Sequence, residues 1–218
     1  MTEILPKPDC CHCPRLVSFL SEQRQKCPHW HNGPVPSFGS IDAELLIVGL
    51  APGLKGANRT GRPFTGDHAG DLLYPTLAKF GFSQGRFDGE ADDGLQLLNC
   101  RITNAVRCVP PENRPTGAEV NNCAPFLLSE INTMKNLKVI MALGGLAHGA
   151  ILKVLSEKKS KWKFAHNQGH ALPNGIMLID SYHCSRYNTN TGKLTAEMFA
   201  DVFRHVKDVL EGNEHGRL

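Results

Sequence analysis

The chain has 218 residues, of which 41% are hydrophobic and 21% charged, with a formal net charge of +3 at pH 7. This composition excludes a mainly disordered protein, because there is enough apolar material to build a core. No apolar run approaches the roughly 20 residues that span a bilayer, and the N-terminal segment lacks the apolar region of a secretory signal. We therefore expect no membrane association and a cytoplasmic location.

Short apolar runs alternate with amphipathic segments along the chain. Strands are predicted at 44–50, 95–106, 138–144 and 175–183. Four helices are predicted. The first covers 73–82, the second begins after a capping box formed by Thr116 and Glu119, the third covers 147–155, and the fourth begins after Thr195. Pro125 predicts a kink or a restarted helix within the second of these segments. This alternation predicts a mostly parallel sheet with helices on both faces, in a single domain over residues 1–218.

Three loops follow predicted strands, at 51–67, 104–115 and 183–194, and they should meet at one edge of such a sheet. The first is rich in glycine, which permits a close backbone approach to a ligand, and its Arg59 and Arg62 suit phosphate. Neither a P-loop nor a dinucleotide-binding motif is present, which excludes the common nucleotide-binding α/β enzymes. The alternative for this loop is a flexible connection.

Eight cysteines are present, and a chain without an export signal is not expected to use them in disulfides. Cys10 and Cys13 form a tight CxxC pair, and Cys108 and Cys123 are spaced across the second loop. These four residues predict a four-thiolate metal site, either structural zinc or an iron–sulfur cluster, with Cys11 as the competitor for Cys10. The alternative is that they are small buried apolar residues.

The third loop follows a predicted strand that ends at His183. A histidine in a ligand crevice is a candidate acid, base or hydrogen-bond donor, although a lone histidine is often structural. Its place on the same sheet edge as the glycine-rich loop favours a functional role.

Five segments of the chain together resemble the uracil-DNA glycosylase superfamily, and within it the iron–sulfur-containing family 5. In chain order they are GLAPG, NRTGRPFTGDHAG, ITNAVRC, a later cysteine and HCSRYNTNTGKLT. The resemblance runs from Cys10 to about Phe203. It implies a three-layer α/β/α sandwich around a central parallel four-stranded sheet. It also implies a [4Fe–4S] cluster, with a mainly structural role, held by Cys10, Cys13, Cys108 and Cys123.

The implied activity is a monofunctional DNA glycosylase that flips a deaminated base out of DNA and hydrolyses its N-glycosidic bond. Asp67 and His183 are the expected catalytic residues, with Asn58 as a helper. The expected base-binding residues are Ala51, Gly53, Phe64 and Asn104. The expected DNA-binding residues are Arg59, Arg62, Ser185, Arg186 and Tyr187, among which Arg186 either fills the gap left by the flipped base or contacts a phosphate.

The apolar Ala51 stands where several related families carry a polar residue that positions water. The pocket is therefore expected to have room for hypoxanthine or xanthine as well as uracil. The alternative is a non-catalytic iron–sulfur module that binds lesions in DNA. The expected partner is damaged DNA that contains uracil or another deaminated base, and we expect a monomer.

Overall fold

Four apolar runs form the centre of the sheet in the computed structural model, which describes residues 3–213. They are β2 (Leu45–Gly49), β5 (Cys100–Asn104), β6 (Val139–Leu143) and β8 (Met177–Ser181). They pair in parallel in the order β5-β2-β6-β8. Strands buried on both faces read as continuous apolar runs, which is why the sequence pattern located them. The predicted parallel four-stranded centre is confirmed.

Two short antiparallel strands, β1 (Phe38–Gly39) and β7 (Gly169–Ala171), extend this sheet at its two edges to six strands. The strand predicted over 95–106 is divided, because Asn99 adopts a positive φ of 49° between two extended segments. Its first part, β4 (Gln96–Leu97), pairs instead with β3 (Ser83–Gln84) in a separate hairpin.

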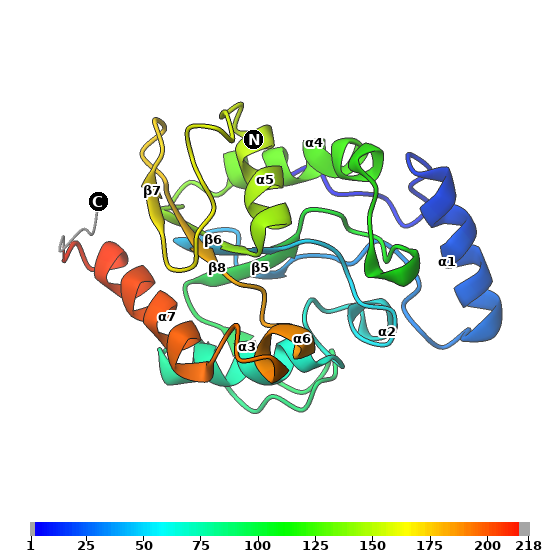
Figure 1. Cartoon of the computed structure of the whole chain (residues 1–218). Coiled ribbons are helices and arrows are strands. Elements are labelled where there is room, and N and C mark those ends of the chain that lie inside the picture. The colour runs from blue at the N-terminus through cyan, green and yellow to red at the C-terminus, as the bar shows by residue number, and fades with distance from the viewer. Residues whose placement is uncertain (1–2, 214–218) are drawn as a thin grey trace.

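Helices form a layer on each face of the sheet (Figure 1). The helices of the described residues are α1 (Pro14–Lys26), α2 (Ala57–Thr60), α3 (His68–Lys79), α4 (Gly117–Thr133), α5 (Gly145–Val154), α6 (Arg186–Asn190) and α7 (Ala196–Leu210). Side chains alternate between the two faces of a strand. One set packs with α3 and α7, and the other packs with α4 and α5. The predicted three-layer architecture is confirmed.

Two predicted helices differ in detail. The helix predicted from residue 73 begins at His68, because the Asp67 side chain caps its first turn. The kink predicted at Pro125 does not divide α4, which is one helix that begins at the predicted capping box. Buried residues before and after the proline, Cys123 and Leu127 among them, hold both halves against the rest of the protein.

Helix α1 was not predicted, and it packs at the side of the molecule rather than on the sheet (Figure 1). Leu16 and Leu20 of this helix join a third apolar cluster with Val106, Val109 and Phe126. Within residues 3–213, no helix combines the length and the apolar character that a membrane span requires.

Candidate active site

A cavity of about 690 Å³ opens at the carboxyl ends of β2, β5 and β8. The three loops that the sequence singled out meet there, as expected for an α/β sheet. Eight predicted site residues line the cavity, namely Ala51, Gly53, Phe64, Asp67, Asn104, His183, Ser185 and Arg186. The volume falls in the range of ordinary ligand pockets and accommodates a nucleobase with part of its sugar.

Asp67 presents a carboxylate to the cavity from the N-terminus of α3. Its Oδ1 accepts hydrogen bonds from the backbone N–H groups of Ala69 and Gly70, at 3.1 and 3.2 Å. Its Oδ2 lies against the glycine-rich loop, where a Cβ added to Gly53 or Gly56 would come within 3.2 or 2.8 Å of that oxygen. One oxygen is therefore fixed by the helix, and the glycines leave space for the other.

Burial raises the pKa of Asp67 above its ordinary value, and the two backbone N–H donors oppose that rise only in part. A carboxylate with a raised pKa is a stronger proton acceptor than an exposed one. This environment is typical of catalytic carboxylates in clefts.

Phe64 and Asn104 form a second part of the wall, beside the last residue of β2. A Cβ added to Gly49 would clash with the Asn104 amide oxygen and would approach the Phe64 ring to 2.6 Å. Glycine at this position therefore lets the ring and the amide lie side by side. The two side chains provide a flat apolar surface next to a group that both donates and accepts hydrogen bonds.

The Phe64 backbone is in the left-handed region, with φ of 57°, which is rare for a bulky residue. Two neighbours hold it there. The Tyr74 hydroxyl donates a hydrogen bond of 2.6 Å to the Pro63 carbonyl. Gly70 lies so close to the Phe64 carbonyl that a side chain would not fit. Strain of this kind persists where the surrounding structure enforces it, and it concentrates at functional sites.

His183 lies two residues beyond β8, and its ring centroid is 6.2 Å from that of Phe64. Burial lowers the pKa of His183, so the imidazole is neutral near pH 7. A neutral imidazole can still donate one N–H to an acceptor in the cavity. The Asn188 amide donates to the His183 carbonyl at 2.8 Å and ties this segment to α6.

The segment around α6 forms one side of the cavity mouth. The Ser185 hydroxyl caps this short helix, accepting a hydrogen bond from the Asn188 N–H. Arg186 lines the cavity, and Tyr187 is 74% exposed although it is a large aromatic residue. Both side chains are thus placed on the surface beside the opening.

Arg62 does not face the cavity or solvent. Its guanidinium forms two hydrogen bonds of 2.7 and 2.6 Å with the Asp93 carboxylate, and both side chains are almost fully buried. The rings of Phe38, Tyr74 and Phe87 surround it, with centroids 5.0–5.8 Å away. The predicted phosphate contact by Arg62 is wrong, because an interior carboxylate already binds this cation.

Arg59 forms a similar two-point pair with Glu90, but this pair is partly exposed.

Replacing Arg62 by methionine is expected to lower the free energy of unfolding by about 3 to 5 kcal/mol, because it leaves a buried carboxylate unpaired. The matched change Arg59→Met should cost less than about 1 kcal/mol. Urea unfolding of the two variants measures both values, and an equal, small loss in the two would contradict the structural role of Arg62.

Asn58 also lies away from the cavity wall. It is fully buried, its amide donates to the Asn32 side chain at 2.9 Å, and its backbone N–H donates to the Gly53 carbonyl at 3.1 Å. This placement behind the wall does not support the predicted catalytic help from Asn58, which stays a prediction. The residue braces the glycine-rich loop from behind, which the sequence could not distinguish from a role at the front.

Three polar residues that the sequence reasoning did not single out, Lys55, His68 and Asn113, also line the cavity. His68 Nε2 lies 2.8 Å from the Thr189 hydroxyl and joins the start of α3 to α6. Asn113 has a positive φ of 56° in the proline-rich loop after β5. The loops over 51–67 and 104–115 were predicted to reach this edge of the sheet, but nothing in their sequence distinguished Lys55 or Asn113 from the neighbouring residues.

The four cysteines of the predicted metal site converge in space. Cys13, Cys108 and Cys123 are buried in the third apolar cluster, and Cys10 packs against it. Burial, and after it the neighbouring thiols, raise the pKa of Cys108 to about 12. Cys11, the competitor for Cys10, is exposed to solvent.

The spacing of these sulfurs bears on the kind of metal. Around one zinc ion, four sulfurs at 2.3 Å would lie about 3.8 Å from each other. Within residues 3–213, only one group of three or more potential ligand atoms has all of them within 4.8 Å of one another, and it contains no cysteine. The four thiols, as the described residues place them, are therefore spread more widely than around a single zinc ion.

The fold and the cavity define an α/β protein that binds its ligand at the carboxyl edge of a parallel sheet. The family model of the uracil DNA glycosylase superfamily matches residues 36–207. A type-5 uracil-DNA glycosylase of Thermus thermophilus is 44% identical over 91% of this chain and 92% of its own length. One from Pyrobaculum aerophilum is 40% identical over 90% and 87%. A type-4 uracil-DNA glycosylase of the same organism is 34% identical over 75% and 79%. The chain belongs to the uracil-DNA glycosylase superfamily.

Proposed function

We propose that this protein removes uracil from DNA by hydrolysing the N-glycosidic bond, which leaves an abasic site. The observation that carries the proposal is the convergence of Asp67, Asn104, Phe64 and His183 on one cavity. The target bond is inaccessible inside a stacked duplex, so the nucleotide must rotate into the cavity before it reacts.

Phe64 and Asn104 are proposed to recognise the flipped base. The Phe64 ring offers a rigid plane for stacking, a contact that is worth about 1–3 kcal/mol per base. The Asn104 amide, beside that plane, can donate to a uracil carbonyl and accept from the uracil N3–H. Because Gly49 allows the two groups to lie together, stacking and hydrogen bonding act on one bound base.

His183 is proposed to stabilise the leaving base. As the glycosidic bond breaks, negative charge develops on the uracil ring and its O2. A neutral imidazole N–H aimed at that oxygen stabilises the charge, and one such donor is worth about 10²–10³ in rate. The lowered pKa of His183 keeps the ring in this neutral donor form near pH 7.

Asp67 is proposed to hold the attacking water and to stabilise positive charge on the sugar. Its Oδ1 is occupied by the helix N–H groups, so Oδ2 is the oxygen available to a water. A carboxylate beside a developing oxocarbenium ion lowers the barrier through its charge as well as by accepting a proton. The helix fixes the carboxylate before the substrate arrives, so little reorganisation is needed.

The raised pKa of Asp67 predicts an acid limit for activity. The ionised form is the active one, so kcat/KM should be full above the pKa and fall as the pH decreases through it. The midpoint is expected above the ordinary aspartate value of about 3.9. Rates of uracil release across this range test the prediction in protein shown to stay folded by circular dichroism. A rate that stays level down to the ordinary value would contradict it.

The segment from Ser185 to Tyr187 is proposed to contact the DNA beside the cavity. Tyr187 is exposed and large enough to fill the space vacated by the flipped nucleotide. Arg186 is placed either to help fill that space or to bind an adjacent phosphate. Arg59 keeps its proposed phosphate contact, through the exposed part of its side chain.

The substrate range is proposed to include hypoxanthine or xanthine. Ala51 and Gly53 line the cavity with almost no side chain, so that part of the wall does not exclude a larger purine. A pocket that is not crowded discriminates weakly against added volume.

The four cysteines Cys10, Cys13, Cys108 and Cys123 are proposed to hold a [4Fe–4S] cluster. Four thiols in one apolar region, spread more widely than around one zinc ion, support this proposal. When bound, the cluster supplies four iron–thiolate bonds that tie three segments of the chain together. Its proposed role is structural, because none of the four cysteines lines the cavity, although Ala51 and Leu54 of the cavity wall pack against the core that contains them.

The test of the proposed function is base release from end-labelled duplexes that each contain one uracil, hypoxanthine or xanthine. Alkali-sensitive breaks at the lesion are expected with uracil, and with at least one purine if the wider range holds. Breaks with uracil alone would reject the wider range. Binding to all three duplexes without breaks would instead favour the non-catalytic lesion-binding module.

A further inference from the structure

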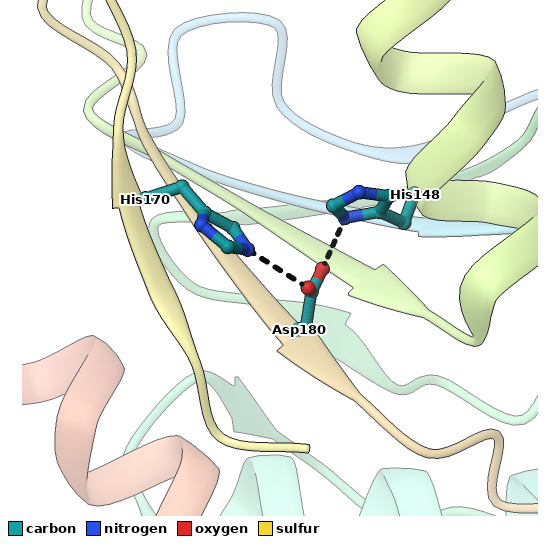
Figure 2. Close-up of side chains that lie close together, drawn as sticks. All are labelled: His148, His170 and Asp180. Atoms are coloured by element: carbon teal, nitrogen blue, oxygen red, sulfur yellow. Dashed lines mark hydrogen bonds and ion pairs between the residues drawn. The ribbon is translucent and has the colours of Figure 1, made fainter. Parts of the chain in front are cut away.

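Three buried side chains outside the cavity form a compact group, which Figure 2 shows. His148 comes from the first turn of α5, His170 from β7 and Asp180 from β8. His148 Nδ1 lies 2.7 Å from one oxygen of Asp180, and His170 Nε2 lies 3.1 Å from the other. All three side chains are almost excluded from solvent. None of them lines the cavity.

The partners of His148 determine its protonation. Its Nδ1 faces the Asp180 carboxylate, and its Nε2 lies 2.9 Å from the Trp162 carbonyl oxygen. A carboxylate and a carbonyl only accept hydrogen bonds, whereas a neutral imidazole carries a single proton. One ring nitrogen would then point a lone pair at an oxygen. The contacts are satisfied only if a second proton, or a metal ion, occupies the Nδ1 side.

The distances distinguish these two possibilities. A zinc ion at about 2.0–2.1 Å from each ligand would hold the nitrogen and the oxygen roughly 3.3 Å apart. The separation of 2.7 Å is that of a charge-assisted hydrogen bond. The positive charge of Lys159 also acts on His148, which disfavours a divalent cation there. The shared proton belongs to the imidazole, because histidine is the stronger base and His170 donates to the same carboxylate.

We propose that His148 is a buried imidazolium whose ion pair with Asp180 positions His183, a role that rests on the proposed function of His183. Gly144 provides the connection. Its N–H donates to the Ser181 carbonyl at 2.8 Å, and its carbonyl accepts from the His148 N–H at 3.0 Å. A Cβ added to Gly144 would come within 3.5 Å of the His183 Cβ. The ion pair therefore joins the start of α5 to the end of β8, three residues before His183.

The contribution of the His148–Asp180 pair to stability decreases as the pH rises. Burial of His148 opposes its charge, but the hydrogen bond and the charge of Asp180 outweigh burial and raise the pKa of His148 above its ordinary value. The other titratable groups near it are His170 and Lys159. The contribution of the pair to stability is complete below the unfolded pKa of about 6.5 and is lost as the pH rises through the higher folded pKa. Above that point, a lone pair would face the carboxylate.

The first test is nitrogen NMR of the full chain with 15N-labelled histidine. At pH 7, both ring nitrogens of the His148 signal are expected to carry protons. The signal is assigned by its absence in His148→Asn. A singly protonated ring would overturn the proposal. So would a stoichiometric metal other than iron that is present in the wild type and lost in that variant.

The second test uses the same variant, because the asparagine Nδ2 matches the Nδ1–H of histidine but does not titrate. We expect the His183 resonances to shift and kcat/KM for uracil to fall about 10- to 100-fold with unchanged DNA affinity. The wild-type loss of stability as the pH rises through the folded His148 pKa should disappear, whereas the control His29→Asn, at an exposed position, should retain it. Unmoved His183 resonances, or an alkaline loss of stability retained in His148→Asn, would overturn the positioning role.

If His148→Asn does not fold, the His148 ring signals are assigned through the backbone resonances of the wild type. Wild-type NMR and the milder His170→Asn then decide the proposal, because removal of the second donor to Asp180 should shift the His148 and His183 signals. Failure of the proposed function would look different. The wild type would then release no uracil at any pH, while its histidine signals still reported the ion pair.

Discussion

Replacing Asp67 by asparagine is expected to lower the single-turnover rate of uracil release by about 10² to 10⁴-fold. Asparagine caps a helix about as well as aspartate, so the hydrogen bonds to the Ala69 and Gly70 N–H groups are retained. The change therefore removes the charge and the basicity of Oδ2 while it preserves the fold and the shape of the cavity. Affinity for the uracil duplex, measured by fluorescence anisotropy, should be little changed.

Asp71 provides the matched control, because it lies in the first turn of the same helix with a largely exposed side chain. Asp71→Asn makes the same chemical change four residues away and should keep the wild-type rate. A full rate in Asp67→Asn, or equal losses in both variants, would show that the carboxylate in the cavity does not act in the reaction.

Replacing Cys108 by serine is expected to destabilise the fold strongly, with a loss of about 3 kcal/mol or more in the free energy of unfolding and a loss of iron. Cys108 lies in the core that joins the segment after β5 to α1 and α4. If the bound group is lost, its bonds to the thiols no longer contribute to the free energy of unfolding. Iron content and thermal unfolding measure the two effects together.

Cys11→Ser is the control for the choice of ligands, because Cys11 is next to Cys10 in sequence but exposed. It should retain iron and stability. A Cys108→Ser protein that lost iron, kept normal stability and no longer bound DNA would argue for a direct role of the cluster in binding. Retention of iron in Cys108→Ser would contradict the proposed ligand set.

The sequence predicted the centre of the fold because that centre consists of continuous apolar runs and capped helices. β2 and β6 are apolar almost throughout, and Thr116 begins α4 with a recognisable capping box. The edge strands β1 and β7 are two and three residues long, which is too short for a periodic pattern. Helix α1 buries only Leu16, Leu20 and Gln23, so its apolar pattern is sparse.

The sequence indicated which residues lie near the candidate site better than it indicated which way their side chains point. Asp67, Asn104 and His183 follow strands or begin a helix at the expected edge, and the fold brings them together. Arg62 and Asn58 occupy the same loop, but a residue type does not reveal which way its side chain points. The partners that turn them inward, Asp93 and Asn32, are about 30 residues away in the chain.

The buried pair of His148 and Asp180 was not predicted for the same reason. The two residues are 32 positions apart, and neither lies in a motif that signals a contact. Pairing of this kind is a property of the packed structure rather than of local sequence.

A flipped uracil is expected to enter this cavity and to leave it as free base. The most direct measurement is mass-spectrometric detection of free uracil, under single-turnover conditions, from a duplex with one uracil opposite guanine. One free uracil per duplex is expected, with the strand intact until alkali is added. A protein that binds this duplex tightly and releases no uracil would contradict it.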